Sequence, residues 1–173
     1  MPESRERTEK ERGRETQGKG APPAAEDAAS AAQAPAAEGP GRAGAGPLDE
    51  RLRAALHAAG ERKALDPVVL DLREVASFTD YFLIASGTNV RQVQAIADAV
   101  EEELRKHLGV RPLRVEGYKS AEWILLDYGD FIFHVFEEKS RRFYDLERLW
   151  RDAARVALPP ELAGGEGSLR NGG

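Results

Sequence analysis

Residues 123–136 read Trp-Ile-Leu-Leu-Asp-Tyr-Gly-Asp-Phe-Ile-Phe-His-Val-Phe, which is two apolar runs on either side of a Gly-Asp pair. A two-residue loop that begins with glycine suits the type II′ turn of a β-hairpin, because glycine readily adopts the positive φ of the first loop position. The sequence therefore predicts two antiparallel strands joined at Gly129 and Asp130. Pairing outward from this loop gives the register of the hairpin: Asp127 opposite Ile132, Leu125 opposite His134, and Trp123 opposite Phe136.

Because side chains alternate between the two faces of a strand, this register sorts the hairpin into two sets. One set is almost entirely apolar and is expected to face the core: Ile124, Leu126, Tyr128, Phe131, Phe133 and Val135. The other set mixes apolar side chains with an acid and a histidine: Trp123, Leu125, Asp127, Ile132, His134 and Phe136. This mixed face fits a protein-binding surface, where aromatic residues dominate the binding energy. The alternative is that a helix covers it, and the sequence favours neither interpretation.

Outward from the hairpin, hydrophobic periodicity predicts the remaining elements. Helices are expected at residues 48–59, at residues 90–108, and from about Asp145 to Ala157. Short apolar strands are expected at residues 67–72, 81–86 and 113–115. The resulting order is α-β-β-α-β-β-β-α, which predicts an α/β (α+β) fold with a mixed five-stranded sheet flanked by helices.

Composition divides the chain of 173 residues into three parts. Residues 1–47 contain no Leu, Ile, Val, Phe, Tyr or Trp, so they cannot bury enough apolar surface to fold and are predicted to form a disordered Ala/Pro/Gly/charged arm. Residues 159–173 are rich in Gly and are predicted to form a disordered tail. Residues 48–158 are expected to form one compact domain.

Several function classes are excluded by simple features. No apolar run approaches the length of a membrane span, and no secretory signal is expected at the N-terminus, so a cytoplasmic location is predicted. The absence of cysteine rules out disulfides and sulfur-ligated zinc. Residues 48–158 are more acidic than basic, which gives no sign of a nucleic-acid-wrapping surface, although a local basic patch stays open.

Candidates for chemistry are few. The chain contains neither a P-loop nor a dinucleotide-binding glycine motif. His134 lacks an evident nucleophile or orienting partner, so a structural role is favoured over a catalytic one. The turn at residues 86–89 ends a strand at a helix N-terminus, where an anion could bind, but a plain turn capped by Asn89 is the favoured interpretation.

A set of motifs is recognisable together. They occupy residues 77–82, 84–88, 91–92, 95–98, 116–117, 123–130, 134–136 and 142–150. In order and spacing they resemble the Iojap-related ribosomal silencing factors, and the resemblance covers roughly residues 48–155. Any one motif is weak, whereas the set is highly specific.

The resemblance implies a nucleotidyltransferase-like topology without enzymatic activity, catalytic residues, metal or cofactor. It implies binding to the large ribosomal subunit through ribosomal protein fourteen of that subunit, on the face where the small subunit docks. Occupying this face blocks subunit joining and lowers translation when nutrients are limiting. Free members of the family can be homodimers, and neither a membrane nor a specific nucleic-acid sequence is an expected partner.

The mixed hairpin face and the family motif together suggest where this partner binds. The candidate partner-binding residues are Trp123, Leu125, Asp127, Tyr128 and Asp130, with Tyr81 and His134 nearby. Tyr128 is the awkward member, because strand alternation directs it toward the core.

Two other functions stay open. One is a nucleotidyltransferase-like nucleotide-binding enzyme that uses Gly87-Thr88 and the hairpin aspartates. The chain lacks the D-x-D pair that a two-metal site of this kind needs, because Asp127 and Asp130 are three residues apart across a turn. The other is a protein adaptor that acts away from the ribosome.

Overall fold

The computed structural model describes residues 48–164. Its elements follow one another in this order: α3 (Glu50–Glu61), β1 (Leu65–Asp71), β2 (Tyr81–Gly87), α4 (Val90–Leu108), β3 (Arg114–Glu116), β4 (Trp123–Asp127), β5 (Phe131–Glu137), α5 (Glu138–Tyr144), α6 (Leu146–Leu149) and β6 (Ala154–Arg155). The predicted α/β class with a mixed sheet flanked by helices is confirmed.

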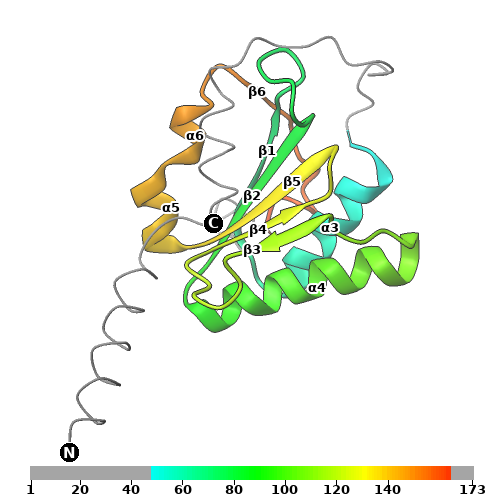
Figure 1. The fold of residues 1–173 in the computed structure, drawn as a ribbon, viewed down its shortest axis with the longest axis vertical. Helices are drawn as coiled ribbons and strands as arrows, with labels where there is room; N and C mark the ends of the chain where they lie inside the picture. The colour runs from blue at the N-terminus through cyan, green and yellow to red at the C-terminus, as the bar shows by residue number, and fades with distance from the viewer. Residues whose placement is uncertain (1–47, 165–173) are drawn as a thin grey trace, which may run out of the picture.

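The strands form one six-stranded sheet in the order β3-β4-β5-β2-β1-β6. β2 and β5 pair in parallel at the centre, and every other neighbouring pair is antiparallel. Figure 1 shows the sheet between two layers of helix, with α3 and α4 on one side and α5 and α6 on the other. Both faces of β2 are therefore covered, which explains its nearly continuous apolar sequence.

Two apolar clusters fill the spaces between sheet and helices. The larger joins α3 and α4 to the sheet face that carries Ile124, Leu126, Phe131, Phe133 and Val135. The smaller lies on the opposite face, where α6 contributes Leu146 and Trp150 follows it.

The β4–β5 hairpin forms as predicted. Its observed pairs are Trp123 with Phe136, Leu125 with His134, and Asp127 with Ile132. Gly129 has a φ of +87°, the positive value that the predicted turn requires.

The turn between β2 and α4 has the favoured capped geometry. The side chain of Asn89 accepts a hydrogen bond from the backbone N–H of Gln92, which fixes the start of α4. A Cβ atom on Gly87 would lie 3.2 Å from Val93, so any larger residue here would push the start of the helix away by a few tenths of an ångström.

The predictions for the last part of the domain are partly wrong. Instead of one helix from Asp145 to Ala157, the chain forms α5 directly after β5 and then the short α6. Asp145 separates them with a left-handed backbone (φ +48°), and an α-helix does not continue through such a residue. The chain then returns to the sheet as β6, which pairs with the end of β1 and is the sixth strand.

The predicted boundaries also need correction at the C-terminal side. Leu162 is only 7 % exposed and belongs to the larger apolar cluster, so packed structure extends beyond the expected end at Leu158. The disorder predicted for residues 1–47 and for the end of the tail, residues 165–173, lies outside the described residues. None of the helices in residues 48–164 is both long and apolar enough to cross a membrane.

Candidate partner-binding site at the β4–β5 turn

The mixed face of the hairpin lies under α5 and α6. Trp123, Leu125 and His134 are 4 %, 1 % and 0 % exposed. The Trp123 ring lies 4.8 Å from that of Tyr144 on α5, measured between centroids. The interpretation of this face as an exposed protein-binding surface is therefore wrong, and the alternative of a covering helix is confirmed.

His134 is a buried, neutral residue in this layer. Its Nδ1 accepts a hydrogen bond from the indole Nε1 of Trp123 at 3.0 Å, and the Phe82 ring lies 4.4 Å away between centroids. Burial lowers the pKa of His134 to about 3, because the imidazolium would lose its hydration. With Nδ1 as the acceptor, the proton is assigned to Nε2, which has no hydrogen-bond partner among the described residues. The residue holds Trp123 in place and stays uncharged at neutral pH.

Tyr128 also lies in the interior, as strand alternation predicts. It is 6 % exposed, and its ring stacks on that of Phe131 at 4.8 Å. Burial raises the pKa of its hydroxyl because the phenolate would be poorly solvated. A partner therefore has little direct access to Tyr128.

The turn itself is tied to the loop before β2. The Thr79 hydroxyl donates to the carbonyl oxygen of Gly129 at 2.8 Å. The backbone N–H groups of Asp80 and Tyr81 donate to the carbonyl oxygen of Asp130 at 2.8 and 3.2 Å. These bonds hold the turn at the start of the central parallel strand pair.

Asp127 completes this local structure. Its Oδ1 accepts from the N–H of Gly129 at 2.8 Å, and its Oδ2 accepts from Nε of Arg114 at 3.3 Å. Its side chain is only 15 % exposed, so most of its hydrogen-bonding capacity serves the turn. Asp127 is thus mainly a residue that shapes the site.

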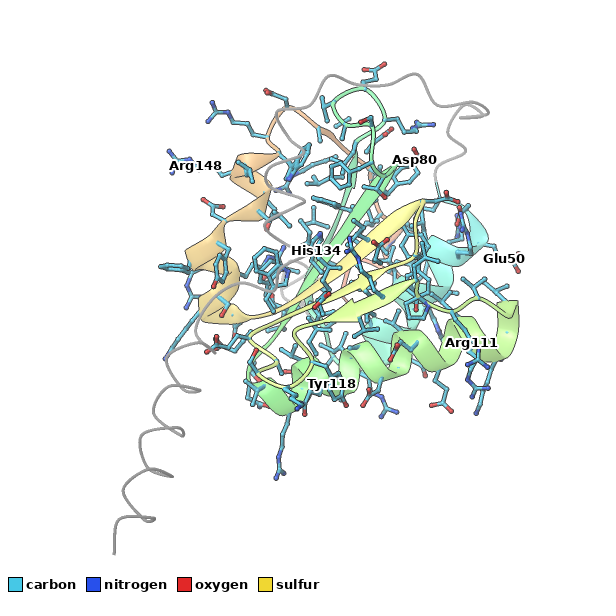
Figure 2. All side chains as sticks on the ribbon, in the orientation of Figure 1. Glu50, Asp80, Arg111, Tyr118, His134 and Arg148 are labelled. Atoms are coloured by element: carbon cyan, nitrogen blue, oxygen red, sulfur yellow. The ribbon has the colours of Figure 1, made fainter. Side chains whose placement is uncertain are left out.

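Asp130 is the accessible member, with 63 % of its side chain exposed. Its Oδ2 accepts from Nη2 of Arg51 at 2.9 Å, and the same nitrogen lies 3.1 Å from Asp49. The guanidinium also lies over the Phe131 ring, 5.5 Å from its centroid. In Figure 2, Asp80 and Glu50 mark this side of the molecule, while Arg148 lies on the other.

Tyr81 is half-buried beside the turn. The Arg73 guanidinium lies 5.4 Å from the centre of its ring and binds the Asp71 carboxylate through Nε and Nη2 at 2.9 and 2.7 Å. Partial burial raises the pKa of the Tyr81 hydroxyl. Tyr81 therefore offers part of one ring to a partner, held in place by Arg73.

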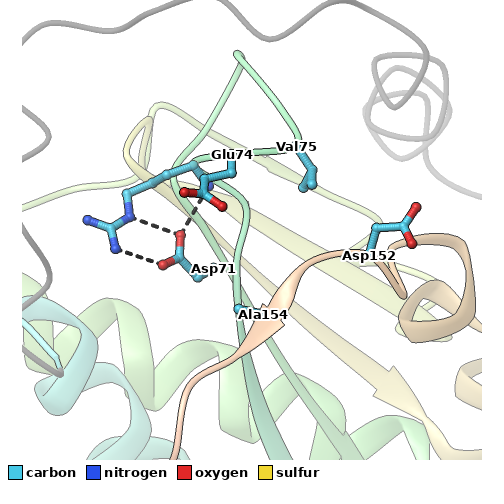
Figure 3. A pocket seen from close by; sticks show the side chains of 6 residues that line it. Asp71, Glu74, Val75, Asp152 and Ala154 are labelled. Atoms are coloured by element: carbon cyan, nitrogen blue, oxygen red, sulfur yellow. Dashed lines mark hydrogen bonds and ion pairs between the residues drawn. The ribbon is translucent and has the colours of Figure 1, made fainter.

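The same ion pair lines an open pocket of about 430 Å³. Figure 3 shows its residues: Asp71, Arg73, Glu74, Val75, Asp152 and Ala154. Arg73 binds both oxygens of Asp71, so the charge of this carboxylate is already compensated by a cation. Within residues 48–164, no group of three or more His, Asp or Glu side chains is placed to hold a metal ion.

The structure thus brings Asp127, Asp130 and Tyr81 together at one end of the sheet and buries the other predicted site residues. Sequence reasoning missed Thr79 and Arg51, which hold the turn and its carboxylate. Thr79 lies within a recognised motif, but Arg51 is about eighty positions from Asp130 and carries no local signal. What remains accessible at this end of the sheet is an acidic turn, in which Asp130 and the neighbouring Asp49 are exposed and share Arg51.

The comparisons identify the family. A family model described as "Ribosomal silencing factor during starvation" matches residues 47–169, and the chain belongs to this family. Proteins named Ribosomal silencing factor RsfS from Halalkalibacterium halodurans and Bacillus subtilis are 39 % and 38 % identical, over 63 % and 62 % of this chain and 92 % and 90 % of theirs. A crystal structure of a Bacillus halodurans protein has a TM-score of 0.56 at 38 % identity and covers 63 % of this chain and 98 % of that one.

A more distant relative comes from Mus musculus and is named "Mitochondrial assembly of ribosomal large subunit protein 1". It is 31 % identical over 52 % of this chain, and the match covers 40 % of the mouse protein.

Proposed function

We propose that this protein is a translational repressor that binds the large ribosomal subunit through its ribosomal protein fourteen and blocks joining of the small subunit. The observation that carries the proposal is the family match across the whole described domain. The names of the relatives add support, since several refer to ribosomal silencing and the mouse relative's name refers to the large subunit. Such a block would lower translation, and the description of the family refers to starvation, which supports a role under nutrient limitation.

The accessible acidic turn fits the protein-binding part of this function. Asp130 and the neighbouring Asp49 present carboxylates on one side of the molecule. A partner surface with Arg or Lys side chains would complement them and would be attracted from a distance. Because the turn is already fixed by Thr79 and the loop before β2, binding does not have to order it, which removes one cost of association.

Steric occlusion needs no cofactor and no catalytic residue, so we propose that the protein is not an enzyme. The geometry disfavours the nucleotidyltransferase alternative. Gly87-Thr88 lies at the C-terminal end of β2, whereas Asp130 lies beside the N-terminal end of the same strand. Seven residues of strand separate the two by roughly 20 Å, too far for both to act on one phosphate group.

The test is sedimentation of the full chain with isolated large subunits, followed by addition of small subunits. The wild type is expected to co-migrate with large subunits and to reduce the peak of joined ribosomes. The variant Asp130→Lys is expected to bind at least about tenfold more weakly, because the new cation repels a basic partner. Glu161→Lys is the matched control, since it makes the same charge change at another exposed acid.

Failure of the wild type to co-migrate with large subunits at moderate salt would contradict the proposed function. Equal binding by Asp130→Lys and Glu161→Lys would leave the function standing but remove the turn as the contact. The adaptor alternative predicts co-migration with neither subunit.

A further inference from the structure

A second surface lies on the opposite side of the molecule from the acidic turn. Lys139, Arg142 and Phe143 occupy positions i, i+3 and i+4 of α5, so they share one helix face, and all three are exposed. The exposed residues Arg148, Leu149 and Arg151 continue this surface along α6 and the turn after it. We refer to these six residues as the basic-aromatic patch.

Phe143 is the most unusual member, because 80 % of it is exposed. The next residue, Tyr144, packs inward on Trp123, which turns the preceding side chain toward solvent. The Phe143 ring meets that of Tyr144 edge to face, with 5.0 Å between the ring centroids, and this is the one ring contact that it makes among the described residues. Such an aromatic side chain contributes little to the core and is available to a partner.

The charge of this segment differs from that of the rest of the domain. Residues 138–155 contain six basic and four acidic residues, whereas residues 48–137 contain eleven basic and sixteen acidic ones. The cations of the patch are therefore a local positive region on an acidic protein.

Two other arginines of the segment share one carboxylate, which balances one of their two charges. Arg141 and Arg155 both bind Glu147, each at 2.9 Å, and Arg141 also donates to Ser86 at 3.0 Å. By contrast, Arg142 and Arg148 are exposed and make no ion pair among residues 48–164. Arg141, whose side chain is 13 % exposed, is thus held within the fold, whereas Arg142 and Arg148 project from it without an ion pair among the described residues.

We infer that the basic-aromatic patch is a contact surface for ribosomal RNA, and this inference rests on the proposed function. Guanidinium groups bind phosphates through two parallel hydrogen bonds, and an open aromatic ring stacks on an unpaired base. Both contacts are independent of base sequence, which agrees with the expectation of no sequence-specific nucleic-acid partner. An acidic protein surface would also pair with the arginines, and the crosslinking experiment below distinguishes it from RNA.

The location of the patch suggests two-point attachment. Figure 2 places Arg148 on one side of the molecule and Asp80 and Glu50, which lie near the acidic turn, on the other. The acidic turn would repel RNA phosphates, whereas the patch would attract them. Protein contact at the turn and RNA contact at the patch would fix the orientation of the domain on the subunit.

The first experiment measures binding of the full chain to isolated large subunits over a range of KCl concentrations. The variant Arg142→Glu with Phe143→Ala is expected to bind at least about tenfold more weakly, with the slope of log affinity against log salt reduced by about one. The control, Arg91→Glu with Val90→Ala, makes the same change in charge at another adjacent pair of exposed residues. Equal affinity of the two double variants would overturn the inference without affecting the proposed function.

The second experiment identifies the class of partner directly. With a benzoylphenylalanine photocrosslinker at position 143 of the full chain, irradiation on the large subunit is expected to link the protein to RNA. Crosslinks to ribosomal protein alone would overturn the inference in favour of an acidic protein contact.

Fluorescence anisotropy with deproteinised large-subunit RNA measures RNA binding in the absence of ribosomal proteins, so this binding does not depend on a protein contact at the acidic turn. Loss of that binding in the patch variant, but not in the Asp130→Lys variant, would support the patch even if the protein-fourteen contact fails.

Discussion

His134 illustrates how a single side chain links packing to pH. It is fully buried, it accepts a hydrogen bond from Trp123, and burial lowers its pKa to about 3. In the unfolded chain the imidazole has an ordinary pKa near 6.5. At pH values between about 3 and 6.5, His134 is protonated in the unfolded chain but stays neutral in the folded protein. Folding therefore becomes less favourable as the pH falls below about 6.5.

The expected contribution is a loss of up to about 1.4 kcal/mol of unfolding free energy per pH unit between pH 6 and pH 4. Urea unfolding at several pH values measures it. The variant His134→Gln keeps an acceptor for the Trp123 indole but does not titrate, so it is expected to be less stable at neutral pH and to show a shallower pH dependence. Parallel curves for the two proteins would show that other groups cause the acid sensitivity.

At the level of elements, α6 is a single helical turn that separates a buried from an exposed leucine. Leu146 is 3 % exposed and lies in the smaller apolar cluster, whereas Leu149 is 50 % exposed. Both residues are leucines of the same helix. Comparing their substitutions therefore measures how much the packing of α6 on the sheet contributes to the unfolding free energy.

We expect Leu146→Ala to lower the unfolding free energy by about 2–4 kcal/mol, because it removes buried methyl groups and leaves a cavity. Leu149→Ala is expected to cost less than about 1 kcal/mol. Chemical denaturation followed by circular dichroism gives both values. Similar losses in the two variants would contradict the assignment of Leu146 as the inward-facing residue.

The same region shows where sequence patterns succeed and fail. The hairpin was predictable in register because Gly129 marks the turn and the strand period of two then sorts every side chain. The final helix was not, since the spacing of Leu146, Leu149 and Trp150 is helical while the left-handed backbone at Asp145 has no clear sequence signal. β6 has two residues and is a strand only because the end of β1 offers it a partner.

The site was predictable only in part for a related reason. Sequence places Trp123 and His134 on a mixed face, but only the tertiary structure shows that α5 and α6 cover that face. Asp130 was identified correctly as lying in the turn, whereas its ion pair with Arg51 depends on the docking of α3. Long-range contacts of this kind leave no periodicity in the chain.

At the scale of the whole molecule, one sheet separates two apolar layers, and the unfolding of each layer can be followed by a different spectroscopic signal. Both tryptophans, Trp123 and Trp150, lie in the layer under α5 and α6. Most of the helix lies in the other layer, in α3 and α4. The two layers pack on opposite faces of the same strands, β2, β4 and β5. If these strands came apart in one layer, the apolar side chains of the other layer would be exposed as well.

We therefore expect tryptophan fluorescence and far-ultraviolet circular dichroism to report the same denaturation midpoint, as a two-state domain requires. Urea titration followed by both probes on one sample tests this expectation. A fluorescence change at clearly lower urea than the loss of helix would mean that the layer of α5 and α6 opens first.

The parallel pairing of β2 with β5 has a consequence for the order in which the chain is made. About 45 residues separate the end of β2 from the start of β5, and a ribosome needs roughly 2 to 9 seconds to synthesise them. During that interval the run from Phe82 to Ala85, fully buried in the finished protein, has no β5 beside it. An apolar strand with an open edge pairs readily with other chains. The central strand of this fold thus spends its first seconds as a nascent segment that a chaperone would recognise, until translation delivers its neighbour.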